Sequence, residues 1–206
     1  MAAEIELEKS EGEEEEEIYP FTTEERNRII TAFKADRHYG KYASLVEFLF
    51  FTGCRPSEAL ALQWKHISQH FITFRRVLIY DGKKLVIQDG LKTQKLRNFP
   101  VNAQLAEIIA TIKPKDCHPE SLVFPSPKGK FIDWHNFTTR AWTKVLASLS
   151  QDTLLPDGEV LPSVEYRNPY QMRHTFCSLC REGDIASIQL AKWVGNSAEM
   201  IRSSLC

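Results

Sequence analysis

The sequence has little that would hold it in a membrane or cross-link it through disulfides. It contains no uninterrupted apolar run of about 18 residues, which a transmembrane helix needs, and its first residues lack the basic and then apolar pattern of a signal peptide. Cysteine is sparse, at five residues in 206, and an odd number without framework spacing favours a reducing interior. We therefore expect a globular chain with no membrane partner, and its hydrophobic content of 43% is enough for a core.

The net charge is also small, but it is unevenly distributed. The formal net charge is -1, yet residues 1–18 contain nine glutamates and one lysine. Without them, 25 basic and 18 acidic residues remain in 19–206, which gives a net charge of +7. A like-charge block with little apolar surface does not fold, so residues 1–18 are predicted to be a disordered tail or linker. The basic remainder favours a polyanionic partner, although an ordinary basic surface has the same charge.

Hydrophobic periodicity predicts a mainly helical body. A capping-box spacing between Thr22 and Glu25 marks the first helix start, and Gly53 marks the end of a helix that is apolar almost all round. The helical patterns are the following: 22–35, 42–53, 56–64, 102–112, 133–149, 169–183, 185–195 and 197–204.

Period-2 patterns predict a small sheet inserted among these helices. Antiparallel strands are expected in 71–80, 83–89 and 96–101, with a short further strand at 122–124, and residues 150–165 are expected to form a loop. The predicted fold class is therefore α+β, mainly α: a helical domain with a small antiparallel three-stranded sheet.

Four short stretches carry groups suited to phosphate chemistry. In chain order, "TGCRPSEALALQW" holds Arg55, "KTQKLRNFPV" holds Lys92, "PYQMRHTF" holds Arg173 and "AKWVGN" holds Asn196. This order resembles the catalytic domain of the tyrosine recombinases, the phage-integrase family, over about residues 21–205. The family has one arginine in T-G-x-R-x-x-E, a lysine in a hairpin of the form K-x-x-K-x-R-x-x-P, and a second arginine in H-x-x-R-H-T.

The resemblance implies a role for each of these residues. Arg55 and Arg173 would clamp the non-bridging oxygens of a DNA phosphodiester, because a guanidinium group is planar, forked and always charged. Lys92 would be the general acid that protonates the leaving 5′ oxygen. Glu58 lies one helical turn from Arg55 and is expected to orient it. The alternative for each arginine is a purely structural ion pair with such a carboxylate.

Three further residues are assigned supporting roles. Lys95 and Arg97 are predicted to contact DNA phosphates near the hairpin lysine, with a solvated basic turn as the alternative. His174 follows the second arginine, where family members commonly have histidine. It shares a helix with Cys177 and Cys180, but without a fourth ligand nearby this spacing does not predict a metal site.

The sequence departs from the family pattern at three positions. Tyr170 stands where the family has histidine, and a phenol with a pKa of about 10 is a poor base, although it can hydrogen-bond a phosphate oxygen. Asn196 replaces histidine or tryptophan and can donate one hydrogen bond. The family's nucleophilic tyrosine would fall at Leu205, and no tyrosine follows Tyr170. We therefore expect this chain, as it stands, to bind DNA without cleaving it.

The resemblance implies the catalytic domain of a site-specific DNA recombinase or integrase, of prokaryotic or phage type, cytoplasmic and nucleoid-associated. It needs neither metal nor other cofactor, because a covalent link conserves the bond energy. Its partner would be double-stranded DNA. Intact family members form tetramers on DNA, whereas this chain, read as a domain over 19–206 that ends at or before the nucleophile, is expected to be a monomer.

Two readings from other classes remain open. The first is a non-catalytic helix-turn-helix-like DNA-binding protein, because residues 185–204 have that character with Gly195 at the turn. The second is a protein-binding domain that uses its acidic tail. On the recombinase reading Arg55, Lys92 and Arg173 converge on one basic pocket, and on the others they need not.

Overall fold

The computed structural model describes residues 18–91 and 96–203. All of the predicted acidic tail except Ile18 therefore lies outside the described residues. The helices are α1 (Thr23–Ala35), α2 (Ala43–Thr52), α3 (Pro56–Leu60), α4 (Ala103–Ile112), α5 (Trp134–Asn136), α6 (Thr143–Ala147), α7 (Gln171–Glu182), α8 (Ser187–Val194) and α9 (Ala198–Ser203), with short 3-10 turns at Gly40–Tyr42 and Trp64–His66 and a π-helical segment at Phe137–Trp142. The strands are β1 (Phe71–Phe74), β2 (Arg76–Asp81), β3 (Lys84–Asp89), β4 (Arg97–Pro100), β5 (Thr153–Leu154) and β6 (Val160–Leu161).

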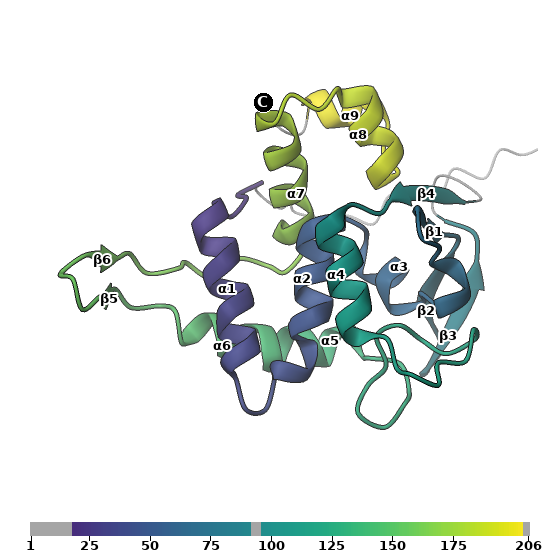
Figure 1. Cartoon of the computed structure of the whole chain (residues 1–206), viewed down its shortest axis with the longest axis horizontal. Helices are drawn as coiled ribbons and strands as arrows, with labels where there is room; N and C mark the ends of the chain where they lie inside the picture. The colour runs from purple at the N-terminus through teal and green to yellow at the C-terminus, as the bar shows by residue number, and fades with distance from the viewer. Residues whose placement is uncertain (1–17, 92–95, 204–206) are drawn as a thin grey trace, which may run out of the picture.

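Helix α2 is the centre of the body. It packs against α1, α4 and α7, and Figure 1 shows α1, α2 and α4 running side by side with α5 and α6 below them. Most of its side chains are buried, including Leu45, Phe48 and Phe50, because a helix that is apolar on all faces is stable only when it is surrounded. The mainly helical class predicted from the sequence is confirmed.

The ends of the first two helices follow the predicted signals. Glu25 accepts the backbone N–H of Thr22 at 2.8 Å, and the Thr22 hydroxyl accepts that of Glu25 at 3.1 Å, which completes the capping box. Gly53 ends α2 in the left-handed region with φ +56°. A Cβ atom there would lie 2.4 Å from Phe176 of α7. Glycine thus lets α7 approach the end of α2.

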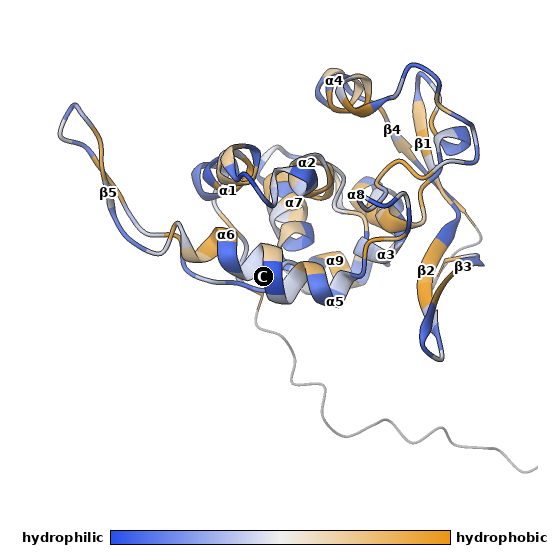
Figure 2. Cartoon of the chain, turned by 90° about the horizontal axis from the view of Figure 1, so that it is seen from below, coloured by the Kyte–Doolittle hydropathy of each residue, from blue (hydrophilic) through white to orange (hydrophobic). Residues whose placement is uncertain are grey.

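The sheet differs from the prediction of three strands. β1 pairs with β4 and β2 pairs with β3, each antiparallel, as separate two-stranded sheets. The predicted strand 71–80 breaks at Arg75, because the consecutive arginines 75 and 76 interrupt the alternation that buries Ile72 and Phe74. The break lets Arg76 reach Asp89 on the surface at 2.7 Å instead of pointing into the core. Figure 2 shows the hydrophobic residues along β2 and hydrophilic ones at the turn of the β2–β3 hairpin.

Three smaller predictions are also compared with the structure. The helix predicted at 133–149 is present as a continuous helical stretch over 134–147, which is composed of α5, the π-helical segment and α6. The segment 122–124 forms only an isolated bridge, between Leu122 and Gln63. The predicted loop 150–165 contains the β5–β6 hairpin, which projects from the body in both views (Figures 1 and 2).

No helix in the described ranges combines the length and apolar character that a membrane span requires.

Candidate functional site

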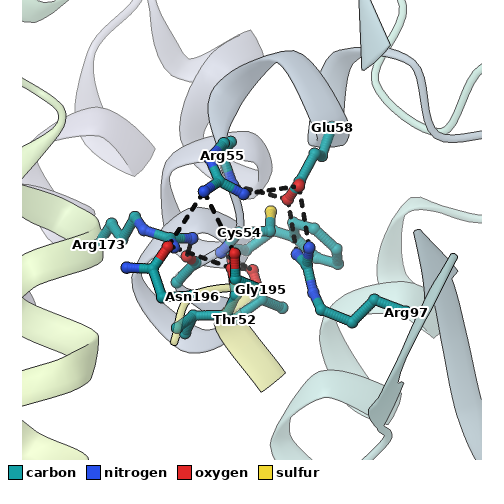
Figure 3. Close-up of polar contacts among 11 residues, drawn as sticks. Thr52, Cys54, Arg55, Glu58, Arg97, Arg173, Gly195 and Asn196 are labelled. Atoms are coloured by element: carbon teal, nitrogen blue, oxygen red, sulfur yellow. Dashed lines mark hydrogen bonds and ion pairs between the residues drawn. The ribbon is translucent and has the colours of Figure 1, made fainter. Parts of the chain in front are cut away.

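Side chains from three distant segments meet at one atom. Arg55 precedes α3, Arg173 lies in α7, and Asn196 follows α8. The Oδ1 atom of Asn196 accepts a hydrogen bond from Nη2 of Arg55 at 3.1 Å and another from Nη2 of Arg173 at 3.0 Å. Figure 3 shows both guanidinium groups directed at this amide. The structure therefore brings together three of the predicted site residues.

The position of Arg55 follows from two neighbouring helix signals. Gly53 ends α2, and Pro56 occupies the first turn of α3, which leaves Arg55 extended at the N-cap. Glu58, in the first turn of α3, accepts the backbone N–H of Arg55 at 2.9 Å and its Nη1 at 3.3 Å. The side chain of Arg55 keeps 18% of its surface exposed, whereas that of Glu58 keeps 1%. Glu58 thus holds Arg55 from the interior side, as expected, and leaves part of its guanidinium accessible.

Arg173 is held by the carboxyl ends of two helices. Its Nη1 donates to the carbonyl of Gly53 at 2.7 Å, after α2, and its Nη2 donates to the carbonyl of Val194 at 2.8 Å, at the end of α8. Such carbonyls have no partner within their helix and carry partial negative charge. Burial lowers the pKa of Arg173, the electrostatic effect of Tyr170 opposes this lowering, and the charge of Arg55 adds a smaller lowering. A guanidinium group remains charged nonetheless.

The orientation of the Asn196 amide is fixed by its neighbours. Arginine side chains only donate hydrogen bonds, so the atom that faces both guanidinium groups must be the amide oxygen. Figure 3 shows the amide nitrogen turned away from them. Asn196 therefore supplies a neutral oxygen at a point where two cations converge.

The structure places Arg97, which was predicted to contact DNA phosphates, in the interior rather than at the surface. Only 3% of Arg97 is exposed, and its two Nη atoms donate to the two carboxylate oxygens of Glu58 at 2.9 and 2.6 Å. Its guanidinium also stacks over Phe74, 4.7 Å from the ring centroid. The alternation of β4 explains the burial, because Arg97 and Phe99 point to the interior face. Read strictly, that alternation was the signal that sequence reasoning missed.

The cluster of Arg55, Arg97, Arg173 and Glu58 has more positive than negative charge. Arg55 and Arg97 contact the carboxylate of Glu58, and Arg173 joins Arg55 at Asn196, so three guanidinium groups and one carboxylate give a formal net charge of +2. Burial alone would raise the pKa of Glu58, but the hydrogen bonds and charges of Arg97 and Arg55 outweigh it, so this pKa lies below its ordinary value of 4.5. Glu58 is thus ionised near neutral pH, and the cluster can accept a further anion.

Two predicted residues lie beside Arg173 at the start of α7. Tyr170 and Arg173 line the same small crevice together with Cys54. The rings of Tyr170 and His174 meet edge to face at 5.5 Å. Burial and the charge of Arg173 lower the pKa of His174, which favours the neutral imidazole near pH 7. Burial raises the pKa of the Cys54 thiol to about 12, so this thiol is not a nucleophile.

Three predicted positions, Lys92, Lys95 and Leu205, lie outside the described residues. A cavity of about 360 Å³ lies between α3 and the β2–β3 hairpin. Leu91 and Arg55 both line this cavity. Within the described residues, no group of three histidine, cysteine or acidic side chains is arranged to hold a metal ion.

The carbonyl groups of Gly53 and Val194 are site features that sequence reasoning did not find. Backbone oxygens look the same at every position of a sequence, and only the approach of Arg173 gives these two their role. The glycine at the end of each helix was visible, but it indicated only where the helix stops.

Comparison of the sequence with protein families now identifies the chain. A model described as the phage integrase family matches residues 20–192. The chain belongs to the phage integrase family. The matched residues of this phage integrase contain Arg55, Glu58, Arg97 and Arg173, whereas Asn196 lies beyond them. Among curated proteins, no significant match is found.

Solved structures share the fold of this phage integrase at low sequence identity. A complex of the Tn1549 transposon integrase with circular intermediate DNA has a TM-score of 0.75 at 19% identity, over 94% of this chain and 63% of that one. The XerH site-specific recombinase bound to its difH substrate has a TM-score of 0.57 at 16% identity, over 91% and 50%. The catalytic domain of bacteriophage HP1 integrase has a TM-score of 0.58 at 17% identity, over 91% and 87%. The present chain thus spans less than two thirds of the Tn1549 and XerH chains.

Proposed function

We propose that this chain is the part of a site-specific recombinase catalytic domain that binds duplex DNA and positions a scissile phosphate. One observation carries the proposal: Arg55 and Arg173, from distant helices, donate to the same atom, Oδ1 of Asn196, at 3.1 and 3.0 Å. Two forked cations that reach one acceptor can grip one phosphate, whose developing charge they would stabilise.

The amide oxygen of Asn196 is a neutral placeholder for a phosphate oxygen. Hydrogen bonds from arginine to an anionic oxygen are about twice as strong as those to neutral acceptors. A phosphate oxygen therefore displaces Oδ1 between the two guanidinium groups. The released amide can then turn its N–H groups to the phosphate. Because Arg173 is only 4% exposed, this movement is what opens it to DNA.

The remaining roles come from the family resemblance. Lys92 acts as general acid on the leaving 5′ oxygen, Tyr170 hydrogen-bonds the phosphate, and His174 supports this end of α7. The Tn1549 transposon integrase is in complex with circular intermediate DNA, and XerH is bound to its difH substrate, which supports DNA as the partner here. The site of action would be the nucleoid of a prokaryotic cell.

Strand cleavage needs an attacking group as well as a phosphate clamp. No tyrosine follows Tyr170 in the 206 residues, and the thiol of Cys54 stays protonated near neutral pH because its pKa is about 12. We therefore propose that this chain by itself binds DNA and forms no covalent link with it. Incubation with a nicked suicide duplex, followed by denaturing gel electrophoresis, tests this statement.

The helix-turn-helix alternative would treat α8 and α9 as an independent reading unit. These helices do share a small core, with Leu190, Val194 and Ile201 buried. Their corner at Gly195, however, is packed against Arg97 and Arg55. This contact favours the recombinase function over the helix-turn-helix alternative, because a helix that only recognises DNA bases would not need to hold two arginines in place.

The experiment compares Asn196→Asp with the wild-type chain. The aspartate has the same size but puts a carboxylate between the two arginines, so it should compete with a phosphate. We expect affinity for a 30-base-pair duplex, measured by fluorescence anisotropy, to fall about tenfold or more, the effect of roughly one charge-assisted hydrogen bond. The free energy of unfolding should not fall.

Asn136→Asp is the control, since it adds the same single negative charge at an exposed position outside the cluster. Its affinity should stay within about twofold of wild type. Wild-type affinity should also fall steeply between low and moderate salt, as for any protein that neutralises phosphates. Equal losses in both aspartate variants, or no duplex binding by the wild-type chain, would contradict the proposal.

A further inference from the structure

We infer that Arg97 is a positioning residue, which fixes both the carboxylate that orients Arg55 and the corner that carries Asn196. The inference rests on the proposed function for its consequence in DNA binding, but its geometry is independent of any ligand. Arg97 itself, at 3% exposure, does not reach DNA.

The first contact is the buried pair with Glu58. Both side chains are 1% exposed, and the carboxylate accepts from both Nη atoms of Arg97. The same two oxygens serve Arg55, with Oε2 accepting its backbone N–H and Oε1 accepting its Nη1. Since one carboxylate plane binds both arginines, any rotation of Glu58 after loss of Arg97 would also release Arg55.

The second contact is with the corner between α8 and α9. Gly195 has φ +73°, and a Cβ atom on it would lie 2.8 Å from Nη1 of Arg97 and 3.5 Å from Nη1 of Arg55. The carbonyl of Gly195 accepts Nη2 of Arg55 at 3.3 Å, and its neighbour Asn196 holds the shared acceptor. Arg97 therefore lies against this corner, on the side of Glu58 (Figure 3).

The third contact explains why Arg97 can hold both partners at once. Its guanidinium lies over Phe74 of β1 at 4.7 Å, and β1 pairs with β4 so that Phe74 faces Arg97 in register. A flat aromatic ring on one side of the guanidinium limits it to in-plane hydrogen bonds, which point to Glu58. The β1–β4 pairing thus sets the orientation of the Arg97 guanidinium, and through Glu58 that of the cluster.

The chain offers a matched control in Arg167. It also forms a pair, partly buried, with a first-turn glutamate, donating to the two oxygens of Glu25 at 2.8 and 3.0 Å. It also stacks on aromatic rings, those of Tyr19 at 3.8 Å and Phe21 at 4.7 Å. Within the described part of the chain, Arg167 does not contact Arg55, Arg173 or Asn196, so its loss should affect folding without affecting the clamp.

The test compares Arg97→Met and Arg167→Met in the full chain. The Nε–Hε signal of Arg55, followed by NMR on ¹⁵N-arginine-labelled protein, reports the clamp without DNA. Duplex affinity, measured at a temperature where both variants are folded, reports the consequence. We expect Arg97→Met to shift or broaden the Arg55 signal and to weaken DNA binding about tenfold to a hundredfold, as for partners that orient metal ligands. Arg167→Met should lower Tm by a similar amount but leave the Arg55 signal and the affinity unchanged.

Two further variants keep the test decisive. Arg97→Lys retains the charge but not the fork and should restore only part of the Arg55 signal. Gly195→Ala keeps every charge and pushes a methyl group against Nη1 of Arg97, so it should shift the Arg55 signal even if Arg97→Met does not fold. A folded Arg97→Met with wild-type Arg55 signal and affinity overturns the inference, as does Gly195→Ala with an unchanged Arg55 signal. Failure of the wild-type chain to bind DNA would instead overturn the proposed function, and the Arg55 signal would still decide the role of Arg97.

Discussion

Two arginine–glutamate pairs, the buried Arg97–Glu58 and the partly buried Arg167–Glu25, are built almost alike. In each, a glutamate in the first turn of a helix accepts the backbone N–H of the N-cap residue: Glu25 in α1 and Glu58 in α3. In each, an arginine distant in sequence donates both Nη atoms to that carboxylate, from Arg167 or from Arg97. Both arginines also stack on aromatic rings. The fold thus uses the same ion-pair arrangement twice to hold the N-terminus of a helix against a segment that is distant in sequence.

The two pairs differ in the residue at the N-cap. In α1 it is Thr22, whose hydroxyl completes the capping box, and the Glu25–Arg167 pair is electrically neutral. In α3 it is Arg55, a second cation on the same carboxylate. Because the N-cap residue is arginine rather than threonine, the neutral ion pair becomes a cluster with excess positive charge, and this cluster lies beside Arg173. The comparison teaches that the site is a structural motif to which a surplus cation has been added.

The largest expected effect comes from removal of either carboxylate. Glu25→Ala leaves Arg167 buried without its partner, which should cost about 3–5 kcal/mol in the free energy of unfolding. Glu58→Ala should cost more, because it leaves Arg97 and Arg55 facing each other and Arg173 with no carboxylate nearby. Urea denaturation of the three chains measures both values. A smaller loss for Glu58→Ala would mean that the two pairs do not differ in charge balance as we describe.

The neutral pair was partly predictable from the sequence. Thr22 and Glu25 have the capping-box spacing, and both of its hydrogen bonds are present. The arginine that completes the pair is 142 residues from Glu25, and no local pattern links residues so far apart. The sequence therefore predicted the start of this helix but not the ion pair with Arg167 that holds it.

The same limit applies at the site. The spacing of Arg55 and Glu58 indicated their contact, and family order indicated that Arg173 and Asn196 would join them. The burial of Arg97 was missed because it follows a lysine-rich turn, where a basic residue is usually solvated. The alternation with Phe99 along β4 would have placed Arg97 on the interior face, and the pairing of β4 with β1 sets it beside Phe74.

Acid should weaken both pairs, and glutamine substitutions can separate their contributions. Burial raises the pKa of each glutamate, but arginine contacts outweigh it, so both pKa values lie below the ordinary 4.5 in the folded chain. A lowered pKa in the folded state means that the stabilisation is complete above about pH 4.5 and is lost as pH falls through the folded value. Each group can contribute a slope of at most about 1.4 kcal/mol per pH unit.

The measurement is the urea midpoint of wild type, Glu25→Gln and Glu58→Gln between pH 6 and pH 3. Each variant should be less stable than wild type at pH 6, and the difference should shrink as pH falls. Because other carboxylates, such as Asp89, also have a lowered pKa, the differences between chains are decisive and the absolute slopes are not. A difference that stays constant from pH 6 to pH 3 would show that the glutamate in question is not ionised in the fold.

The smallest expected effect tests the N-cap residues themselves. Thr22→Ala removes the hydroxyl that accepts the N–H of Glu25 and should cost about 1 kcal/mol, the usual value of an N-cap. Arg55→Ala should cost less, because it removes a cation from a cluster that has too many, and its side-chain contacts are long, at 3.1–3.3 Å. The same change should weaken duplex binding strongly, since function and stability often conflict at such sites. If thermal unfolding shows that Arg55→Ala is the more damaging of the two, then Arg55 is a structural cap in the manner of Thr22. The surplus charge would then have no functional meaning.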